Sequence, residues 1–282
     1  MSKQEQPIPT STLSENASRY ILLQRIDTQE WNPSNLLPEH KRPFDGIYNN
    51  FLVGFESQVR HERICEQYLN HMRSEFQELK PHLPGTVSSI VDIGCGMAGI
   101  DLYLWKHYQE HQPDIVLFDK SEVSEDLYYY FRQQPAFYNS LKTAKENLTN
   151  GDIPEERVHT VEASTENLRG LESIDFCFSL LSWGFHYPVD TYLDEVLEVI
   201  DPEGRVVLDI RKETGDVSKE TDGFKACKQA FDTLKVIKDA RKYKRIILSD
   251  PVSQPQPSSE SKPAQDRAFT EDNPEKTTSG AT

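Results

Sequence analysis

The residues with the clearest chemical character lie where a short apolar run meets a glycine-rich turn. The run spans residues 90–93 and contains one acid, Asp92; glycines follow at the spacing Gly-x-Gly-x-x-Gly, at Gly94, Gly96 and Gly99. A run this short predicts a buried strand, and a helical pattern follows the turn. Strand, glycine turn and helix are typical of a nucleotide-type cofactor site, because glycine lets the backbone approach a ligand closely.

Asp92 bears on which cofactor such a turn would take. In dinucleotide-binding sheets this position is normally apolar, because a carboxylate here would lie close to the anionic pyrophosphate. A carboxylate is better placed beside a cofactor that lacks phosphate and carries positive charge. S-adenosylmethionine, which has an ammonium and a sulfonium group, meets both conditions. Alternatively, Asp92 only accepts hydrogen bonds from the amides of the turn, and the two interpretations are compatible.

Asp119 is the next acid with a place in such a site. It ends a second apolar run, residues 115–119, and is therefore expected at the end of a neighbouring strand. An acid there can accept hydrogen bonds from both ribose hydroxyls. It would serve NAD as well as S-adenosylmethionine, so it supports the class of cofactor and not the choice between them. The alternative is an acid that only caps a turn.

Residues 91–96, Val-Asp-Ile-Gly-Cys-Gly, resemble the first motif of the class I S-adenosylmethionine-dependent methyltransferases. That motif is a hydrophobic residue, an acid, a hydrophobic residue and Gly-x-Gly. The family often has a third glycine two residues later, where this chain has Ala98, with Gly99 next; Gly99 is then expected to be a packing position at the start of the helix. Residues 141–148 and 202–208 also look like family segments, and the resemblance covers about residues 86–250.

The resemblance implies a set of cofactor contacts at the ends of three strands. In the family, an acid followed by a small residue at the end of the third strand faces the adenine amino group, and Glu162-Ala163 match that pattern. Asp119 matches the ribose-binding acid. The implied cofactor-binding residues are Asp92, Gly94, Cys95, Gly96, Asp119, Glu162 and Ala163.

The stretch after the fourth predicted strand, residues 181–188, is expected to face the transferred methyl group. Methyl transfer depends mostly on positioning, but a hydroxyl nucleophile also benefits from a general base, and histidine is suited to that near neutral pH. His186 is the candidate base, with a structural role in the turn as the alternative; Trp183 and Tyr187 are candidates for lining the acceptor pocket, although core packing would explain Trp183 equally well. The Asn/Asp-Pro-Pro-Tyr pattern common among amino-group methyltransferases is missing here.

Short apolar runs alternate with helical patterns from residue 88 onward, which predicts a mostly parallel sheet covered by helices on both faces. Further strands are expected over residues 157–162, 174–181 and 205–210, with helices over 100–110, 138–148 and 222–231, a helix after Asp190 as its N-cap, and a turn at 202–204. Residues 234–237 and 245–248 are close enough to form a hairpin, so one of them is antiparallel. The expected fold is a Rossmann-like α/β fold with seven strands, of which the last is antiparallel.

The remaining chain divides into three segments by composition. Residues 1–44 are polar, and we expect them to be partly disordered, although residues 20–23 and the anchors Trp31, Leu36 and Leu37 could dock on the domain. Residues 45–86 have an apolar stripe at helical spacing and are expected to form a helical lead-in. This lead-in is either one helix or two helices with a break near Gly54. Residues 87–250 form the methyltransferase-like domain, and 251–282 lack the apolar residues needed to offset the entropy of ordering. The aromatic residues 128–131 could form a lid or pack on the N-terminal helix.

The net charge and the positions of the cysteines limit the classes of partner, the metal sites and the cellular location that we expect. A formal net charge of −15 argues against tight binding along nucleic-acid phosphates, and no apolar run is long enough to span a membrane. The basic residues of the hairpin and of residues 60–63 are interpreted mainly as solvated faces. The four cysteines are far apart, so we expect reduced thiols, no zinc site and a cytoplasmic protein. The basic residues of the hairpin are Lys235, Lys238, Arg241, Lys242, Lys244 and Arg245.

The sequence thus predicts transfer of a methyl group from S-adenosylmethionine to a small-molecule acceptor, with oxygen slightly favoured as the acceptor atom. Two alternatives stay open at this point. An NAD(P)-dependent oxidoreductase would use the same glycines and Asp119 but leaves Asp92 unexplained. A non-catalytic protein on the same fold would bind the cofactor without turnover, or not bind it. The acceptor and the oligomeric state cannot be read from the residues.

Overall fold

The computed structural model describes residues 7–24, 46–123, 138–212 and 221–252. The chain divides into two units, Met1–Val252 and Ser253–Thr282, and the second lies wholly outside the described residues. The expectations for Trp31, Leu36 and Leu37, for the aromatic residues 128–131 and for most of the C-terminal tail therefore fall outside what the structure describes.

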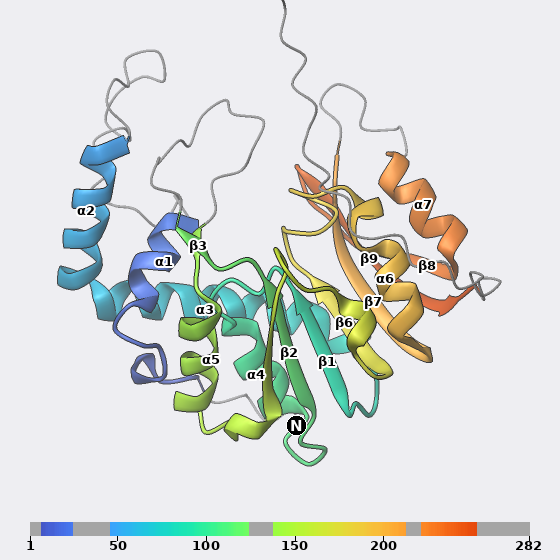
Figure 1. Ribbon diagram of the computed structural model, residues 1–282, viewed down its shortest axis with the longest axis horizontal. Helices are drawn as coiled ribbons and strands as arrows, with labels where there is room; N and C mark the ends of the chain where they lie inside the picture. Colours follow the sequence, from blue (N-terminus) through green and yellow to red (C-terminus); the bar gives the residue numbers. More distant parts are fainter. Residues whose placement is uncertain (1–6, 25–45, 124–137, 213–220, 253–282) are drawn as a thin grey trace, which may run out of the picture. The chain divides into compact units, whose positions relative to one another are not determined.

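A seven-stranded sheet with the order β5-β2-β1-β6-β7-β9-β8 forms the centre of the first unit (Figure 1). Strands β5, β2, β1, β6 and β7 are parallel to one another, whereas β9 is antiparallel to both β7 and β8. The predicted Rossmann-like sheet with an antiparallel last strand is confirmed. Its strands are β1 (Ser89–Ile93), β2 (Asp114–Asp119), β5 (Val158–Glu162), β6 (Ile174–Ser179), β7 (Ile200–Arg211), β8 (Phe231–Asp239) and β9 (Tyr243–Pro251).

The strand order locates the place where a ligand is expected. The chain runs outward from β1 to β2 and β5, and then returns to β6 on the other side of β1. The order therefore reverses between β1 and β6. In open α/β sheets, ligands bind at the carboxyl ends of the strands beside such a reversal. The glycine turn directly follows β1, so it lies at this reversal.

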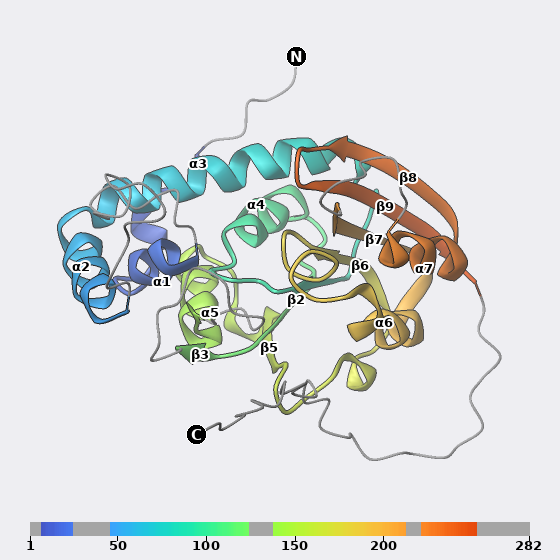
Figure 2. The same ribbon diagram turned by 90° about the horizontal axis from the view of Figure 1, so that it is seen from above.

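The two faces of the sheet bury two separate hydrophobic cores, because successive side chains of a strand point to opposite faces. Ile90 belongs to one core and Val91 to the other, and Leu117 and Phe118 divide in the same way. Figures 1 and 2 show the helices that cover the faces. The first core is covered by α1 (Ala17–Gln24), α3 (His61–Leu79), α4 (Gly99–His107) and α5 (Leu141–Asn150), and the second by α6 (Leu193–Val199) and α7 (Asp222–Ala230).

The predicted helical lead-in consists of two helices, α2 (Gly46–Val59) and α3. The break falls at Arg60, whose φ of −112° and ψ of 17° leave the helical region, and not near Gly54, which stays within α2. The Arg60 side chain is buried in an ion pair with Glu56. Figure 2 shows α3 running along the sheet toward β8 and β9. Its buried residues recur at helical spacing: Ile64, Cys65, Tyr68, Leu69, Met72, Phe76 and Leu79.

Several local expectations need correction. The predicted turn at 202–204 lies inside β7, which begins at Ile200 and shifts register against β6. Asp190 is not a helix N-cap, because it lies within a 3-10 helix and α6 begins after Tyr192. A small sheet of β3 (Glu122–Val123) and β4 (Tyr138–Asn139) was not predicted. The short 3-10 helices are Thr10–Thr12, Lys80–His82, Glu155–Arg157, Leu168–Gly170 and Val189–Thr191.

The predicted solvated basic face of the hairpin is wrong for Arg245. This side chain is 1% exposed and is ion-paired with Asp209 on β7 and with Glu75 on α3. Lys238 also pairs with Glu78, at 2.6 Å. Among the described residues, no helix is both long and apolar enough to cross a bilayer.

Candidate cofactor site and active site

The turn after β1 has a backbone conformation that needs glycine. Gly94 has φ of +80° and Gly96 +53°, and Ala98 between the turn and α4 also has a positive φ, +55°. The Gly94 N–H donates a hydrogen bond to the Phe118 carbonyl at 2.7 Å, which ties the turn to β2. A Cβ at Gly94 would lie 2.1 Å from Ser182 Oγ, so the loop after β6 closes directly on the turn.

Gly99 is a packing position at the start of α4. Its N–H donates to the Tyr68 hydroxyl at 3.0 Å, and a Cβ there would lie 2.5 Å from the Tyr68 ring. The helix N-terminus is therefore partly satisfied by a side chain from α3. In a dinucleotide site the third glycine lets helix and strand pack closely; here the close neighbour is an aromatic ring from the N-terminal helices.

Asp119 lies at the end of β2, directly across from the glycine turn. Its Oδ2 accepts the Gly96 N–H at 3.0 Å and its Oδ1 accepts the Lys120 N–H at 2.7 Å. Burial raises the pKa of Asp119 to about 6, although these two donors act in the opposite direction. A carboxylate oxygen can accept more than one hydrogen bond, so both oxygens retain capacity for ligand hydroxyls.

Glu162 and Ala163 lie beside Asp119 at the end of β5. The register pairs Glu162 with Asp119, and the Ala163 N–H donates to the Asp119 carbonyl at 2.9 Å. Burial acts to raise the pKa of Glu162, but hydrogen bonds from Ser121 and Ser164 outweigh it and lower that pKa. The carboxylate accepts the Ser121 N–H at 3.0 Å and the Ser164 hydroxyl at 2.9 Å. The structure thus brings the predicted residues of β1, β2 and β5 together at one edge.

Asp92 is buried within β1, and the structure adds a second buried acid that the sequence reasoning missed. Asp92 is 3% exposed and Asp101, in the first turn of α4, is fully buried. The two carboxyl groups lie within hydrogen-bond reach of each other. Burial, together with the Asp101 and Asp119 charges, raises the pKa of Asp92 well above its ordinary value, and burial raises that of Asp101 to about 7.

The Cys95 thiol completes the inner wall of the turn. It is buried, and its Sγ lies 3.7 Å from the Gly96 carbonyl. Burial, followed by the charges of the three nearby aspartates, raises the pKa of this thiol well above its ordinary value. Because a nucleophilic cysteine requires a lowered pKa, Cys95 can contribute packing and backbone but not a thiolate.

Two amide side chains approach the turn from outside the predicted set. A Cβ at Gly96 would lie 3.0 Å from Gln24 Oε1 at the end of α1. Gln24 Nε2 donates to Asn139 Oδ1 at 3.4 Å, and Asn139 acts to lower the pKa of both Asp119 and Cys95. The N-terminal helix therefore reaches the site. The sequence carried no signal for this, because Gln24 is an ordinary polar residue at the end of an apolar patch.

His186 lies in a tight turn after β6. The Ser182 carbonyl accepts N–H groups from three residues of this turn, among them the His186 N–H at 2.7 Å. The imidazole is exposed and packs edge-on against Phe185, with centroids 4.9 Å apart. Partial desolvation, followed by the charge of Arg211, lowers the pKa of His186. The ring is therefore neutral near pH 7 and accessible.

The two other residues of this loop are placed differently. Trp183 is fully buried in the second core, and its indole N–H donates to the Val189 carbonyl at 2.7 Å. Core packing, the alternative weighed for it, accounts for this side chain without a ligand. Tyr187 is half-buried and pairs with Trp183 across a short bridge. Tyr187 and His186, unlike Trp183, therefore have accessible surface that could contact an acceptor.

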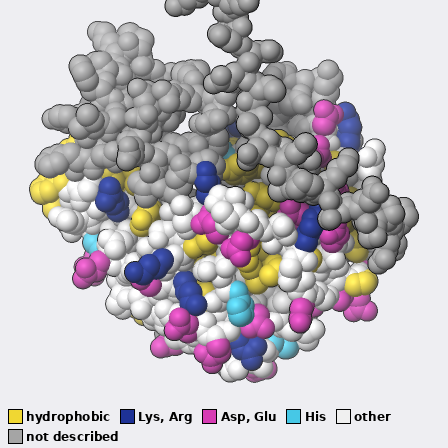
Figure 3. Space-filling model, viewed as in Figure 1, with side chains coloured by type: hydrophobic (Ala, Val, Ile, Leu, Met, Phe, Trp, Pro, Cys, Tyr) yellow, Lys and Arg dark blue, Asp and Glu magenta, His cyan; other side chains and the backbone are white. Residues whose placement is uncertain are grey.

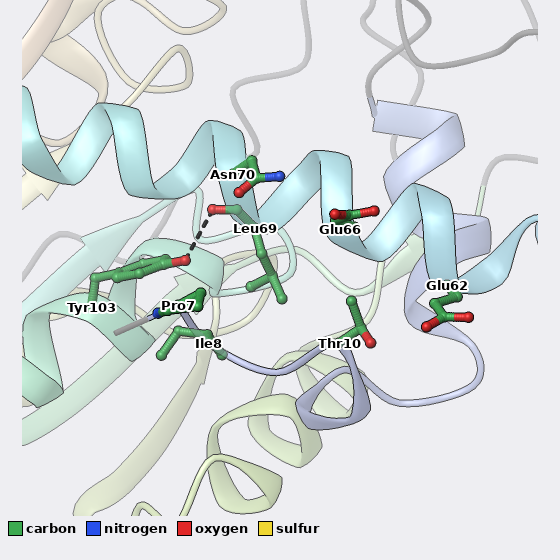
Figure 4. A pocket seen from close by; sticks show the side chains of 8 residues that line it. All are labelled: Pro7, Ile8, Thr10, Glu62, Glu66, Leu69, Asn70 and Tyr103. Atoms are coloured by element: carbon green, nitrogen blue, oxygen red, sulfur yellow. Dashed lines mark hydrogen bonds between the residues drawn. The ribbon is translucent and has the colours of Figure 1, made fainter. Parts of the chain in front are cut away.

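A hollow of about 270 Å³ lies elsewhere, between the N-terminal segment, α3 and α4 (Figure 4). Tyr103 bounds it and donates its hydroxyl to the Leu69 carbonyl at 3.1 Å. None of its lining residues belongs to the predicted site. They are Pro7, Ile8, Thr10, Glu62, Glu66, Leu69, Asn70 and Tyr103.

On the face of the molecule shown in Figure 3, described Lys and Arg side chains are interspersed with Asp and Glu.

Comparisons with known proteins give structural matches only. No family model and no curated protein matches the chain by sequence. Among solved structures, a precorrin-6y C5,15-methyltransferase from Geobacter metallireducens is 16% identical, with a TM-score of 0.42 over 65% of this chain and 87% of that one. A putative O-methyltransferase from Klebsiella pneumoniae is 14% identical, with a TM-score of 0.42 over 84% and 96%. An S-adenosylmethionine-dependent methyltransferase from Mesorhizobium loti is 22% identical, with a TM-score of 0.32 over 49% and 53%.

The observed sheet decides the fold. It has the predicted seven strands with an antiparallel last strand: β9 lies between β7 and β8 and is antiparallel to both. The chain has the class I methyltransferase fold. The glycine turn, Asp119 and Glu162 lie together at the carboxyl ends of β1, β2 and β5.

Proposed function

We propose that the chain binds S-adenosylmethionine at the carboxyl ends of β1, β2 and β5 and uses it to methylate a small-molecule acceptor. One observation carries the choice of cofactor. Asp92, Asp101 and Asp119 gather around the glycine turn, and each charge of a described residue that shifts the pKa of Asp92 or Asp119 is another carboxylate. Acids buried without a basic partner are costly, and a cationic ligand would supply that partner.

The same cluster argues against a dinucleotide. A pyrophosphate at this turn would add negative charge beside carboxyl groups whose pKa values are already raised by burial and by one another. A ligand with an ammonium and a sulfonium group gains from every one of these charges. The NAD(P)-dependent alternative is therefore disfavoured by the electrostatics of the described site.

The site residues take separate roles in this proposal. Asp119 accepts the ribose hydroxyls, Glu162 and Ala163 face the adenine, and the backbone of 94–96 lies along the ligand with no side chain at the two glycines. Asp92 attracts the ammonium end. The cofactor, when bound, supplies a methyl group on a positively charged sulfur, and the chain's own task is to orient the acceptor toward it and exclude water.

His186 is proposed as the base for a hydroxyl acceptor. Its lowered pKa keeps the ring neutral near pH 7, so a ring nitrogen can take the hydroxyl proton as the oxygen forms its bond to carbon. Trp183 supports the loop from within the core, and Tyr187 contacts the acceptor. Oxygen is the favoured acceptor atom because a nearby base matters most for a hydroxyl. A cytoplasmic location is part of the proposal, supported by four free and buried cysteines.

Calorimetric binding of S-adenosylhomocysteine to the full chain tests the cofactor. We expect binding, and Asp119→Asn should weaken it by about 10- to 100-fold because hydrogen bonds to a charged group are lost. Asp114→Asn is the matched control, since Asp114 begins the same strand at its opposite end. Tighter binding of NADH than of S-adenosylhomocysteine, or equal affinities of the two variants, would contradict the proposal.

Turnover with labelled S-adenosylmethionine and a metabolite extract tests the base. His186→Ala should lower the rate by about 10²- to 10⁴-fold while the affinity for S-adenosylhomocysteine is unchanged. His159→Ala serves as the control, because His159 is an exposed histidine that contacts Asp114 near the start of β5. Equal rates for both variants would remove His186 from the mechanism. Cofactor binding without turnover on any acceptor would favour the non-catalytic alternative.

A further inference from the structure

Asp101 is a buried acid to which the proposed function assigns no role. It is fully buried, and neither of its carboxylate oxygens accepts a hydrogen bond from a donor of another described residue. It belongs to the first turn of α4, where the helix dipole favours negative charge only modestly. An unsatisfied buried carboxylate is expensive, so the group must be neutralised in some other way.

The neighbour within reach is Asp92, which is itself buried and acidic. Two carboxylates in contact cannot both be ionised at low cost, but one proton held between them makes a hydrogen bond and removes one charge. The pair then carries a single negative charge. This arrangement satisfies Asp101 without any basic side chain.

Among the described residues, the groups that face the pair from each packed element do not supply a cation. Asp119 faces it from β2, with Glu162 beyond Asp119 on β5. The thiols of Cys95 in the turn and Cys177 on β6 lie near Asp92, and burial keeps both protonated by raising their pKa values. From α3, the Tyr68 hydroxyl accepts the Gly99 N–H next to the pair.

We propose that Asp92 and Asp101 share one proton in the free protein and release it to solvent when the ammonium end of the cofactor binds. The inference rests on the proposed function and adds a proton to its binding step. Asp101 is then a positioning residue that acts through Asp92: it holds the proton that keeps the buried pair stable until a ligand cation replaces it.

Proton release makes affinity depend on pH in a defined direction. Because the pKa of Asp92 is raised well above its ordinary value, we expect the pair to keep one proton on Asp92 after Asp101 itself ionises near pH 7. Binding of S-adenosylhomocysteine should therefore tighten as the pH rises from about 7 to 8, by up to about tenfold per pH unit. Asp119 does not contribute to the pH dependence of binding between about pH 7 and 8. Its pKa of about 6 means that it is already ionised before the ligand binds. In Asp101→Asn, the amide donates permanently to Asp92, so the shared proton is gone and the affinity should be independent of pH over this range.

Calorimetry in two buffers of different ionisation enthalpy counts the protons directly. At about pH 7.5, S-adenosylhomocysteine should release about one proton from the wild-type chain and none from Asp101→Asn. Methylthioadenosine, which keeps the nucleoside but lacks the ammonium group, should release none from the wild type. Asp114→Asn is the control and should release as many protons as the wild type.

The outcomes separate this inference from the proposed function. Binding of S-adenosylhomocysteine without proton release, or equal release from wild type and Asp101→Asn, would overturn the shared proton and leave the cofactor assignment standing. No binding at any pH would overturn both. If Asp101→Asn does not fold, the wild-type proton count and the comparison with methylthioadenosine still decide.

Discussion

Among the described residues, two groups of acids in and near the core of the sheet differ in whether a described basic side chain accompanies them. In the first, Asp209 of β7 is bound by Arg245 of β9 through two hydrogen bonds, of 2.7 and 2.9 Å. In the second, Asp92, Asp101 and Asp119 surround the glycine turn, and the charges acting on Asp92 and Asp119 are again carboxylates. Within the described part of the chain, the first group has a basic partner and the second has none, so a proton or a cationic ligand would supply the missing positive charge.

The first group, Asp209 with its partner Arg245 and the neighbouring Glu75, is called the paired group below, and it joins elements that are distant in the sequence. Arg245 also lies 2.6 Å from Glu75 of α3, so one guanidinium links β7, β9 and the long N-terminal helix. Asp209 Oδ2 accepts the Leu181 N–H at 3.2 Å as well. Leu181 precedes the serine that packs against Gly94. The paired group therefore holds the loop that closes on the cofactor turn.

The contrast indicates where this fold uses charge for stability and where it keeps charge for binding. A buried acid with a well-placed arginine has part of its desolvation cost offset by attraction and hydrogen bonds, although burial still raises the pKa of Asp209. A buried acid without one stays destabilising until something positive arrives. Functional sites commonly retain charged groups whose desolvation is not compensated within the protein. The second group, Asp92, Asp101 and Asp119, lies where the strand order reverses.

The largest effect is expected from removing the arginine. Arg245→Met keeps most of the side-chain volume but leaves Asp209 buried without its partner, which should lower the free energy of unfolding by about 3–5 kcal/mol. Urea denaturation of the full chain measures it. The double variant Arg245→Met with Asp209→Asn removes the orphaned charge and should recover part of the loss. A single variant as stable as the wild type would show that the two groups do not differ as described.

Arg245 also shows what the sequence could and could not reveal. The alternation of short apolar runs with helices predicted the sheet. The acid at the end of the second apolar run pointed to Asp119, and the family resemblance pointed to Glu162; the two lie together because strand ends in a parallel sheet meet at one edge. Arg245 stands in a basic stretch that looks solvated, and only the pairing of β9 with β7 places it beside Asp209. Asp101 lies among apolar residues of a helix, which was the one available signal that it is buried.

The pH dependence of the free energy of unfolding should distinguish the acids around the glycine turn from the paired group, even in the absence of a ligand. Asp101 has its pKa raised to about 7, so the folded state holds a proton that the unfolded chain loses near its ordinary pKa. Its contribution is therefore fully present below that ordinary value and is lost as the pH rises toward 7. The slope is about 1.4 kcal/mol per pH unit for one such proton.

Urea denaturation between about pH 5 and 7 measures this slope. The wild-type chain should lose stability more steeply with rising pH than Asp101→Asn, and Asp114→Asn should follow the wild type. Glu75 in the paired group acts in the opposite direction. Although burial opposes it, Arg245 lowers the pKa of Glu75, so its contribution is lost as the pH falls through that lowered pKa. Parallel curves for the wild type and Asp101→Asn would contradict a raised pKa at Asp101.

The smallest effect is expected where the paired group meets α3. Glu75→Gln keeps the shape of a side chain that is 12% exposed but removes its charge beside Arg245 and Lys238, which should lower the free energy of unfolding by about 1 kcal/mol. Glu66→Gln, an exposed position on the same helix, is the control and should change little. In the Arg245→Met background, Glu75→Gln should cost less than in the wild type, because its main partner is already gone. Equal costs in both backgrounds would mean that Glu75 stabilises α3 independently of the arginine, and that the paired group ends at the sheet.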